Sequence, residues 1–278
     1  MRIWPALAVT FRAGSPSEVQ DLVSAALDGL GVVAIDEPSD DVWRVCFRDE
    51  TSRASALEQL AGGAGFTVES LDMLDDDWAR RSQASLGAIR VGHLVVTPPW
   101  ADEAANRAPG TLTIVIEPGM GFGSGHHATT RLCLAALLAE SPTGKTVLDV
   151  GTGSGVLAIA AAMLDAKSVL AIDVDPDALD SARTNAALNV LRPVLEFREA
   201  DFRAGTLPRR DIVLANLTGG MLIAAVENVM GCCVPGGTII LSGITSDESP
   251  DVTAAFARRG SIRHSAEEAG WVSLVVRA

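Results

Sequence analysis

One short segment of the sequence combines a carboxylate with three glycines: residues 149–155 read Asp-x-Gly-x-Gly-x-Gly. An apolar run at 146–150 leads into it, and a helical pattern at 154–163 follows directly. A second apolar run, at 168–172, then ends on Asp173. Glycines let a ligand approach the backbone closely, and an acid at the end of the next strand can accept hydrogen bonds from ribose hydroxyls. The segment therefore predicts a β-α-β unit that binds a nucleotide-type ligand.

The acid inside this loop bears on which ligand is bound. Residues 153–158 fit the dinucleotide fingerprint Gly-x-Gly-x-x-Ala, whereas residues 149–155 fit a methyltransferase loop. Asp149 would repel a pyrophosphate at the helix N-terminus. It can instead accept a charge-assisted hydrogen bond from the α-ammonium group of S-adenosylmethionine. We therefore favour S-adenosylmethionine over NAD. The residues expected to bind it are Asp149, Gly151, Gly153, Gly155 and Asp173.

Two further polar residues follow strand-like runs, where open α/β sheets bind their ligands. Asp201 comes after the run at 194–198 and is expected to accept from the adenine amino group, with Phe202 able to contact the ring. Asn216 ends the run at 211–215 and is expected to lie beside the cofactor, which it would help to bind, and to hold an incoming neutral amine in line with the sulfonium methyl group. The alternative interpretations are a surface acid and a helix cap.

A glycine-rich segment lies upstream, at 118–126, and precedes a helical pattern at 127–139. Such a loop is suited to act as a lid over a bound cofactor. Its adjacent histidines, His126 and His127, project differently and have no third ligand near them in sequence, so no metal site is expected.

Alternating strands and helices must position these residues. Strands are expected at 111–116, 146–150, 168–172, 194–198, 211–215, 237–242 and 271–276, and helices at 127–139, 154–163, 177–188, 219–231 and 250–258. This alternation favours an open, mostly parallel sheet with helices on both faces.

The first part of the chain has a different pattern. Strands are expected at 4–11, 32–35, 42–47 and 66–71, with helices at 15–30 and 51–60. The order β-α-β-β-α-β is that of a ferredoxin-like domain. We therefore predict a recognition domain at 1–74, a linker at 75–110 and a catalytic domain at 111–278.

Charge is concentrated in the first domain. Of 278 residues with a net charge of −13, residues 1–76 contain 14 Asp and Glu against 5 Arg. Such a surface repels nucleic acid and favours a basic partner, although solubility alone is an alternative explanation. The sequence shows no apolar run of the roughly 20 residues that a membrane helix needs and no signal peptide, so a cytoplasmic location is expected.

These motifs together resemble the ribosomal protein L-eleven methyltransferases (the PrmA family) over nearly the whole chain. The segments that carry the resemblance are 75–78 (DDDW), 98–100 (PPW), 118–130 (PGMGFGSGHHATT), 148–162 (LDVGTGSGVLAIAAA), 172–179 (IDVDPDAL), 215–217 (ANL), 241–244 (LSGI) and 270–272 (GWV). One departure is Gly-Phe-Gly-Ser-Gly at 121–125, where the family commonly has Ala-Phe-Gly-Thr-Gly.

The resemblance implies a Rossmann-like class I methyltransferase domain with a small N-terminal ferredoxin-like α+β domain that binds the basic ribosomal protein. It implies methylation of lysine ε-amino and N-terminal α-amino groups. Phe122, Gly123 and Thr129 would then contact the cofactor, and Asn216 with Leu217 would line the acceptor site. The protein is expected to act as a monomer. Another protein lysine or a small molecule as acceptor, and an NAD-dependent oxidoreductase or a binding module, remain the alternatives.

Overall fold

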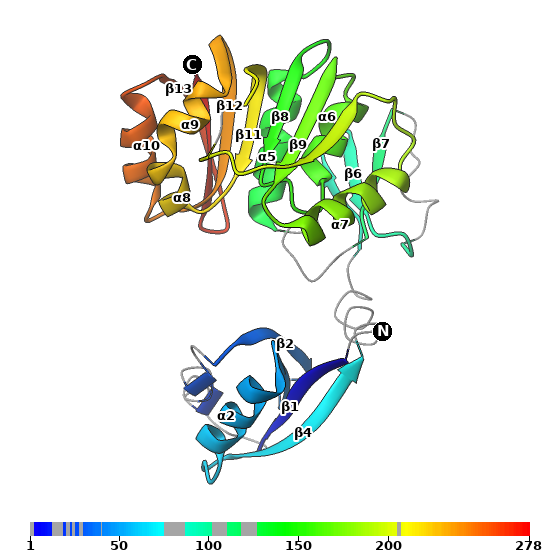
Figure 1. The fold of residues 1–278 in the computed structure, drawn as a ribbon, viewed down its shortest axis with the longest axis vertical. Helices are drawn as coiled ribbons and strands as arrows, with labels where there is room; N and C mark the ends of the chain where they lie inside the picture. The colour runs from blue at the N-terminus through cyan, green and yellow to red at the C-terminus, as the bar shows by residue number, and fades with distance from the viewer. Residues whose placement is uncertain are drawn as a thin grey trace. The chain divides into compact units, whose positions relative to one another are not determined.

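The computed structural model describes residues 3–12, 19–20, 23, 26–27, 30–39, 41–74, 87–101, 110–117, 127–204 and 207–278. The chain divides into two compact units, Met1–Ser85 and Leu86–Ala278 (Figure 1). Within the described parts, no helix is long and apolar enough to cross a membrane.

The first unit is built on a four-stranded antiparallel sheet with the order β2-β3-β1-β4. Its elements are β1 (Ile3–Phe11), β2 (Val32–Ser39), β3 (Val42–Phe47), α2 (Glu50–Leu60) and β4 (Phe66–Leu74). Residues 19–20, 23 and 26–27 are helical and lie between β1 and β2 in the chain. This is the ferredoxin-like order that the sequence predicts.

Two features hold the first unit together. Leu7, Val9 and Phe11 of β1 belong to a buried cluster that also includes apolar residues of α2. The side chain of Arg53 then ties α2 to β4, because it donates to the carbonyl oxygen of Leu71 at 2.9 Å and to the carboxylate of Asp72 at 2.8 Å. The unit therefore has its own core.

The second unit contains a seven-stranded sheet with the order β10-β9-β8-β11-β12-β14-β13. The strands are β8 (Thr146–Val150), β9 (Ser168–Asp173), β10 (Leu195–Glu199), β11 (Arg210–Asn216), β12 (Cys233–Thr245), β13 (Ser261–Glu268) and β14 (Trp271–Arg277). The first five in spatial order run parallel, whereas β14 is antiparallel to both of its neighbours. Numbered from β8, the order is 3-2-1-4-5-7-6.

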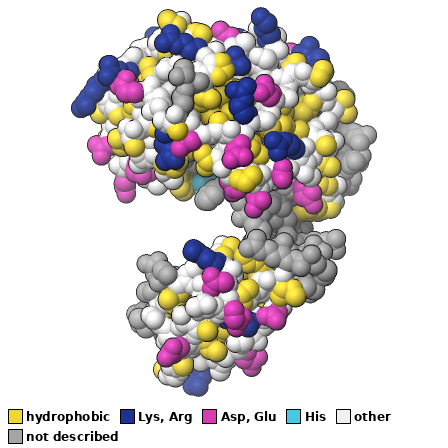
Figure 2. Space-filling view, viewed as in Figure 1, with side chains coloured by type: hydrophobic (Ala, Val, Ile, Leu, Met, Phe, Trp, Pro, Cys, Tyr) yellow, Lys and Arg dark blue, Asp and Glu magenta, His cyan; other side chains and the backbone are white. Residues whose placement is uncertain are grey.

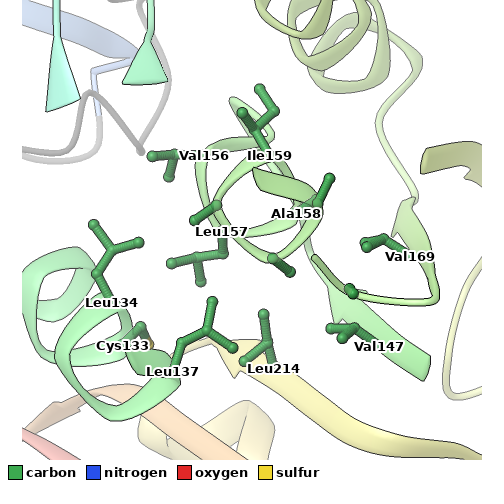
Figure 3. Close-up of a cluster of buried hydrophobic side chains, with 14 of the residues drawn as sticks. Cys133, Leu134, Leu137, Val147, Val156, Leu157, Ala158, Ile159, Val169 and Leu214 are labelled. Atoms are coloured by element: carbon green, nitrogen blue, oxygen red, sulfur yellow. The ribbon is translucent and has the colours of Figure 1, made fainter. Parts of the chain in front are cut away.

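Helices cover both faces of this sheet (Figure 1). They are α5 (Ala128–Glu140), α6 (Val156–Met163), α7 (Pro176–Ala187), α8 (Gly219–Ala224), α9 (Val226–Gly231) and α10 (Ser249–Ala257). Neighbouring strand residues point to opposite faces: Val147 joins the cluster that includes α5 and α6, and Leu148 joins the cluster under α8, α9 and α10. Figure 3 shows the first of these clusters, in which Leu137 of α5 lies beside Leu214 of β11 and Leu157 of α6 lies close to both.

Two of the predicted elements differ from the structure. No strand is predicted where β13 lies, because its residues are mostly polar and five of the eight are exposed at the edge of the sheet. The single helix predicted at 219–231 is interrupted at Ala225, whose φ of −116° and ψ of 20° end α8 and begin α9. Neither change moves the strand ends at which the candidate site lies.

The linker predicted at 75–110 is too long at its C-terminal end. Strands β5 (Ile89–Val91) and β6 (Leu94–Thr97) form a hairpin, and β6 pairs in parallel with β7 (Leu112–Val115). All four residues of β6 are buried. These strands are therefore part of the second unit, while 75–86 and 102–109 lie outside the described residues.

Candidate active site

The turn between β8 and α6 requires its glycines. Gly151, Gly153 and Gly155 have φ angles of 67°, 53° and 82°, in the left-handed region that side chains disfavour. A methyl group at Gly155 would also lie 3.0 Å from the Cβ atom of Ala182, so this glycine lets α7 pack against the turn. The glycines therefore set both the path of the turn at the C-terminal edge of the sheet and its close approach to α7.

Asp149 lies directly under this turn. Its side chain is 1% exposed, and its carboxylate accepts a hydrogen bond of 2.7 Å from the hydroxyl of Thr152. Burial raises the pKa of Asp149 to about 6, and the nearby negative charge of Asp173 acts in the same direction. A buried carboxylate whose charge is this costly is suited to a cationic ligand group such as an ammonium.

Asp173 ends β9 and lies beside the same turn. Its carboxylate accepts hydrogen bonds from the backbone N–H of Gly153 at 3.0 Å and from that of Asp175 at 3.1 Å. A carboxylate offers about four acceptor positions, so the two that remain are available to hydroxyl groups. The acid and the glycine turn predicted to share one ligand therefore lie in direct contact.

Asn216 ends β11 and lies next to the glycine turn. The residue before it, Ala215, is the register partner of Val150, the residue before the turn, and their strands are adjacent and parallel. The Asn216 side-chain amide donates to the hydroxyl oxygen of Thr129 at 3.3 Å. That hydroxyl lies 2.8 Å from Nδ1 of His127, the residue that caps α5. The predicted residues Thr129 and Asn216 are thus brought together.

The sequence analysis assigned no role to two aromatic side chains of this network. The ring of His127 meets that of Trp271 edge-on, with centroids 4.7 Å apart. Burial lowers the pKa of His127, and the positive charge of Arg131 lowers it further. An unprotonated Nδ1, which accepts from the backbone N–H of Thr129 at 3.4 Å, can also accept from the Thr129 hydroxyl, whose oxygen in turn accepts from Asn216. The Gly-Trp-Val motif at 270–272 contains Trp271, but the motif alone does not indicate that its ring contacts His127.

Asp201 and Phe202 lie after β10. Both carboxylate oxygens of Asp201 accept from the guanidinium group of Arg203, at 2.9 and 3.0 Å. These bonds lower the pKa of Asp201. Phe202 is 6% exposed and belongs to the core cluster under α8–α10. Its core position accounts for the apolar side chain, and the expected contact of its ring with adenine stays a prediction.

Phe122 and Gly123, with the lid predicted at 118–126, lie outside the described residues. The residue just before that segment is nevertheless anchored. The backbone N–H of Glu117 donates to the side-chain oxygen of Asn185 at 2.8 Å, and the Asn185 amide donates to the carbonyl oxygen of Ser154 at 2.9 Å. Asn185 is 1% exposed and joins the upstream segment to the glycine turn. A polar residue on the buried stripe of α7 is the signal that could have identified it.

Comparison with known proteins agrees with this geometry. The family model described as "Ribosomal protein L11 methyltransferase (PrmA)" matches residues 35–278. The ribosomal protein L11 methyltransferase of Pelotomaculum thermopropionicum is 36% identical over 275 residues, which cover 97% of this chain and 88% of that protein. The enzyme of the same name from Pseudomonas aeruginosa PAO1 is 34% identical over 229 residues, covering 81% of this chain and 76% of that protein.

A solved structure shows the same likeness. The crystal structure of the ribosomal protein L11 methylase from Lactobacillus delbrueckii subsp. bulgaricus aligns with a TM-score of 0.63 and 30% identity. The alignment covers 69% of this chain and 98% of that one.

The strand order 3-2-1-4-5-7-6 and the glycine turn between an acid-bearing strand and its helix define a class I methyltransferase fold. The chain belongs to the ribosomal protein L11 methyltransferase (PrmA) family. Its cofactor is S-adenosyl-L-methionine. The residues present fit that cofactor, because a buried carboxylate lies beneath the glycine turn and the carboxylate of Asp173, which can accept from hydroxyl groups, lies beside it.

Proposed function

We propose that the protein transfers methyl groups from S-adenosyl-L-methionine to lysine ε-amino groups and the N-terminal α-amino group of the large-subunit ribosomal protein L11. The observation that carries the proposal is the juxtaposition of Asn216 with the glycine turn at the ends of two paired parallel strands. The relatives' names supply the identity of the substrate.

In this proposal the cofactor is held by Asp149 through its ammonium group and by Asp173 through its ribose hydroxyls, with Asp201 near the adenine. When bound, it supplies a methyl group on a positively charged sulfur, which is already a good leaving group. The protein therefore contributes mainly position and exclusion of water. Phe122, Gly123 and Thr129 are further proposed cofactor contacts.

Asn216 is the proposed catalytic residue. Because its amide nitrogen donates to Thr129, the orientation of the side-chain oxygen is fixed. That oxygen can accept an N–H of the incoming amine and direct the nitrogen lone pair at the methyl carbon. A lysine ammonium group, whose reference pKa is about 10.4, would first release a proton to solvent, because only the neutral amine has a free lone pair. The N–C bond would then form as the bond between the methyl carbon and the sulfur breaks, and the donor would leave as a neutral thioether.

The first unit is the proposed recognition domain. Exposed acids on its described surface are Asp41, Asp49, Glu50, Glu58, Glu69 and Asp72. Figure 2 shows Asp and Glu side chains spread over the visible face of this unit. Such a surface suits a basic ribosomal protein. We place the reaction in the cytoplasm and the protein as a monomer.

The test is transfer of labelled methyl groups to purified ribosomal protein L11, followed by mass spectrometry of the product. Asn216→Ala should lower kcat about a hundredfold, in line with the cost of misplacing a reacting group, and should leave cofactor affinity nearly unchanged. Asn228→Ala is the matched control, because Asn228 is an amide on α9 whose bond is to the carbonyl oxygen of Arg203. Binding of NAD without S-adenosylmethionine, or methylation of other acceptors only, would contradict the proposal.

A further inference from the structure

The segment that lines the proposed acceptor site lies directly on a glycine of the neighbouring strand. Gly243 is in β12, and a methyl group added there would meet the carbonyl oxygen of Leu217 and lie 2.8 Å from its carbonyl carbon and 3.0 Å from its nitrogen. These are backbone atoms, which cannot turn aside as a side chain can. The backbone N–H of Leu217 also donates to the carbonyl oxygen of Ser242 at 3.0 Å.

The local geometry of β12 explains why this approach is possible. Gly243 has a φ of 82° and lies where the register of β12 with β14 shifts, between Leu241 and Ile244. Bulges of this kind occur next to active sites, where they redirect the chain. Here the irregularity and the missing side chain together open room for the backbone that leaves β11.

Leu217 also contacts the cofactor turn on its other side. A methyl group at Gly151 would lie 2.7 Å from Cδ2 of Leu217. Gly243, Leu217 and Gly151 therefore form a stack across the ends of β12, β11 and β8. A displacement of Leu217 by even part of an ångström would move Asn216, its neighbour in the chain, relative to the turn.

We propose that Gly243 is a positioning residue for methyl transfer, because its missing side chain sets the distance between the Asn216–Leu217 segment and the cofactor turn. This inference rests on the proposed role of Asn216 at the acceptor site. Gly243 itself touches no reacting atom. Its effect is on turnover, through the placement of Asn216.

Gly236 provides a matched control in the same strand. Its φ is 74°, close to that of Gly243, but a methyl group there would meet no described atom within 4 Å. Alanine at either position therefore suffers the same backbone strain, and only at 243 does it collide with Leu217. The difference in kcat between Gly243→Ala and Gly236→Ala therefore measures the effect of the collision with Leu217 alone.

The experiment measures kcat with L11, the Kd for S-adenosylmethionine and the thermal midpoint for both variants and the wild type. We expect Gly243→Ala to lower kcat about a hundredfold at saturating substrates, while Gly236→Ala stays close to the wild type. Amide hydrogen exchange should be faster at Leu217 in Gly243→Ala alone. Gly243→Asn and Gly236→Asn repeat the comparison with less backbone strain, because asparagine tolerates positive φ, and the collision with Leu217 remains at 243 alone.

The outcomes separate the two proposals. A wild-type protein that methylates no protein amine refutes the proposed function, whatever the variants do. An active wild type with equal kcat in the two variants refutes the role of Gly243. A loss in Gly243→Ala that matches the unfolded fraction alone also refutes it, because a positioning residue must act on the folded enzyme.

Discussion

The carboxylate of Asp149 links pH to cofactor binding. Its pKa is about 6 because it is buried, and a bound ammonium group would favour the ionised form. Affinity for S-adenosylmethionine should therefore rise with pH through about 6 and stay high until the ligand's α-ammonium group loses its proton, near 7.7–8.0 for an ordinary α-amino group. Asp149→Asn should bind about 10- to 100-fold more weakly at pH 7, the worth of one charge-assisted hydrogen bond, and lose the rise through about 6. Titration calorimetry between pH 5 and 8 tests both, and a retained pH step in Asp149→Asn would contradict the assignment.

The raised pKa of Asp149 also makes stability depend on pH, and in the opposite direction: stability of the cofactor-free protein should fall as pH rises, whereas cofactor affinity should increase. The folded-state pKa of Asp149 is raised above its unfolded value of 3.8, so its contribution to stability is greatest below the unfolded pKa and is lost as pH rises through about 6. Asp149→Asn should consequently stabilise the cofactor-free protein at pH 7.5, by up to about 3 kcal/mol. Thermal unfolding at pH 7.5 and pH 5 measures this, and a variant that is less stable at both pH values would show the prediction to be wrong.

Asp173 and Asp175 form a matched pair for the ribose assignment. Both side chains accept backbone hydrogen bonds before or at the start of α7, Asp173 from Gly153 and Asp175, and Asp175 from Asp177. Each alanine variant should lose about 1 kcal/mol of stability for each hydrogen bond that it removes. Only Asp173→Ala should also weaken S-adenosylmethionine binding severely, because it alone loses the acceptors for the hydroxyls. Titration calorimetry measures the affinity of both variants for S-adenosylmethionine, and equal affinities would refute the ribose role of Asp173.

At the scale of elements, two asparagines four residues apart, Asn185 on α7 and Asn189 just after its end, bind the end of β7 and the segment that follows it. The backbone N–H of Val115 donates to the Asn189 side chain, which donates back to the Val115 carbonyl, each at 2.8 Å. Asn185 binds the next segment but also holds the carbonyl of Ser154 in the glycine turn. Helix α7 therefore ties the end of β7 to the cofactor turn.

This arrangement predicts different outcomes for the two asparagines. Asn185→Ala and Asn189→Ala should each destabilise the protein by about 1–3 kcal/mol, because each leaves backbone groups without their partner. Cofactor affinity should fall in Asn185→Ala alone, since only Asn185 contacts the turn. Thermal unfolding combined with calorimetry distinguishes them. A similar loss of affinity in both variants would mean that general loosening, and not the link to Ser154, is responsible.

The elements that the sequence predicts well are those whose pattern is strong and local. The β8–turn–α6–β9 unit has apolar runs of strand length and glycines that break them, so its bounds are within two residues of the structure. β13 could not be predicted in this way, because an edge strand buries little and needs few apolar residues. The contacts of Asn185, Phe202 and Gly243 were also hidden, since each depends on which strands become neighbours, and spacing along the chain does not determine that.

At the scale of the whole molecule, each of the two units has its own hydrophobic core. The first unit has its own buried clusters, and the second has a cluster on each face of its seven-stranded sheet. The proposed cofactor and acceptor residues that the structure describes all belong to the second unit. The first unit contributes 14 Asp and Glu against 5 Arg over residues 1–76. Chemistry and attraction of a basic substrate are therefore assigned to separate parts of the chain, which can be tested apart.

A protein beginning at Leu86 should bind S-adenosylmethionine as the full chain does, because every proposed cofactor contact remains. Its kcat/KM for L11 should fall at least about tenfold, since the acidic unit no longer raises the encounter rate. Raising the salt concentration should lower kcat/KM in the full-length protein and have little effect on the truncated one, because salt screens attraction between charges. A short lysine peptide serves as the control acceptor and should be methylated equally by both. Unchanged methylation of L11 by the truncated protein would overturn the recognition role of the first unit and leave the methyltransferase site intact.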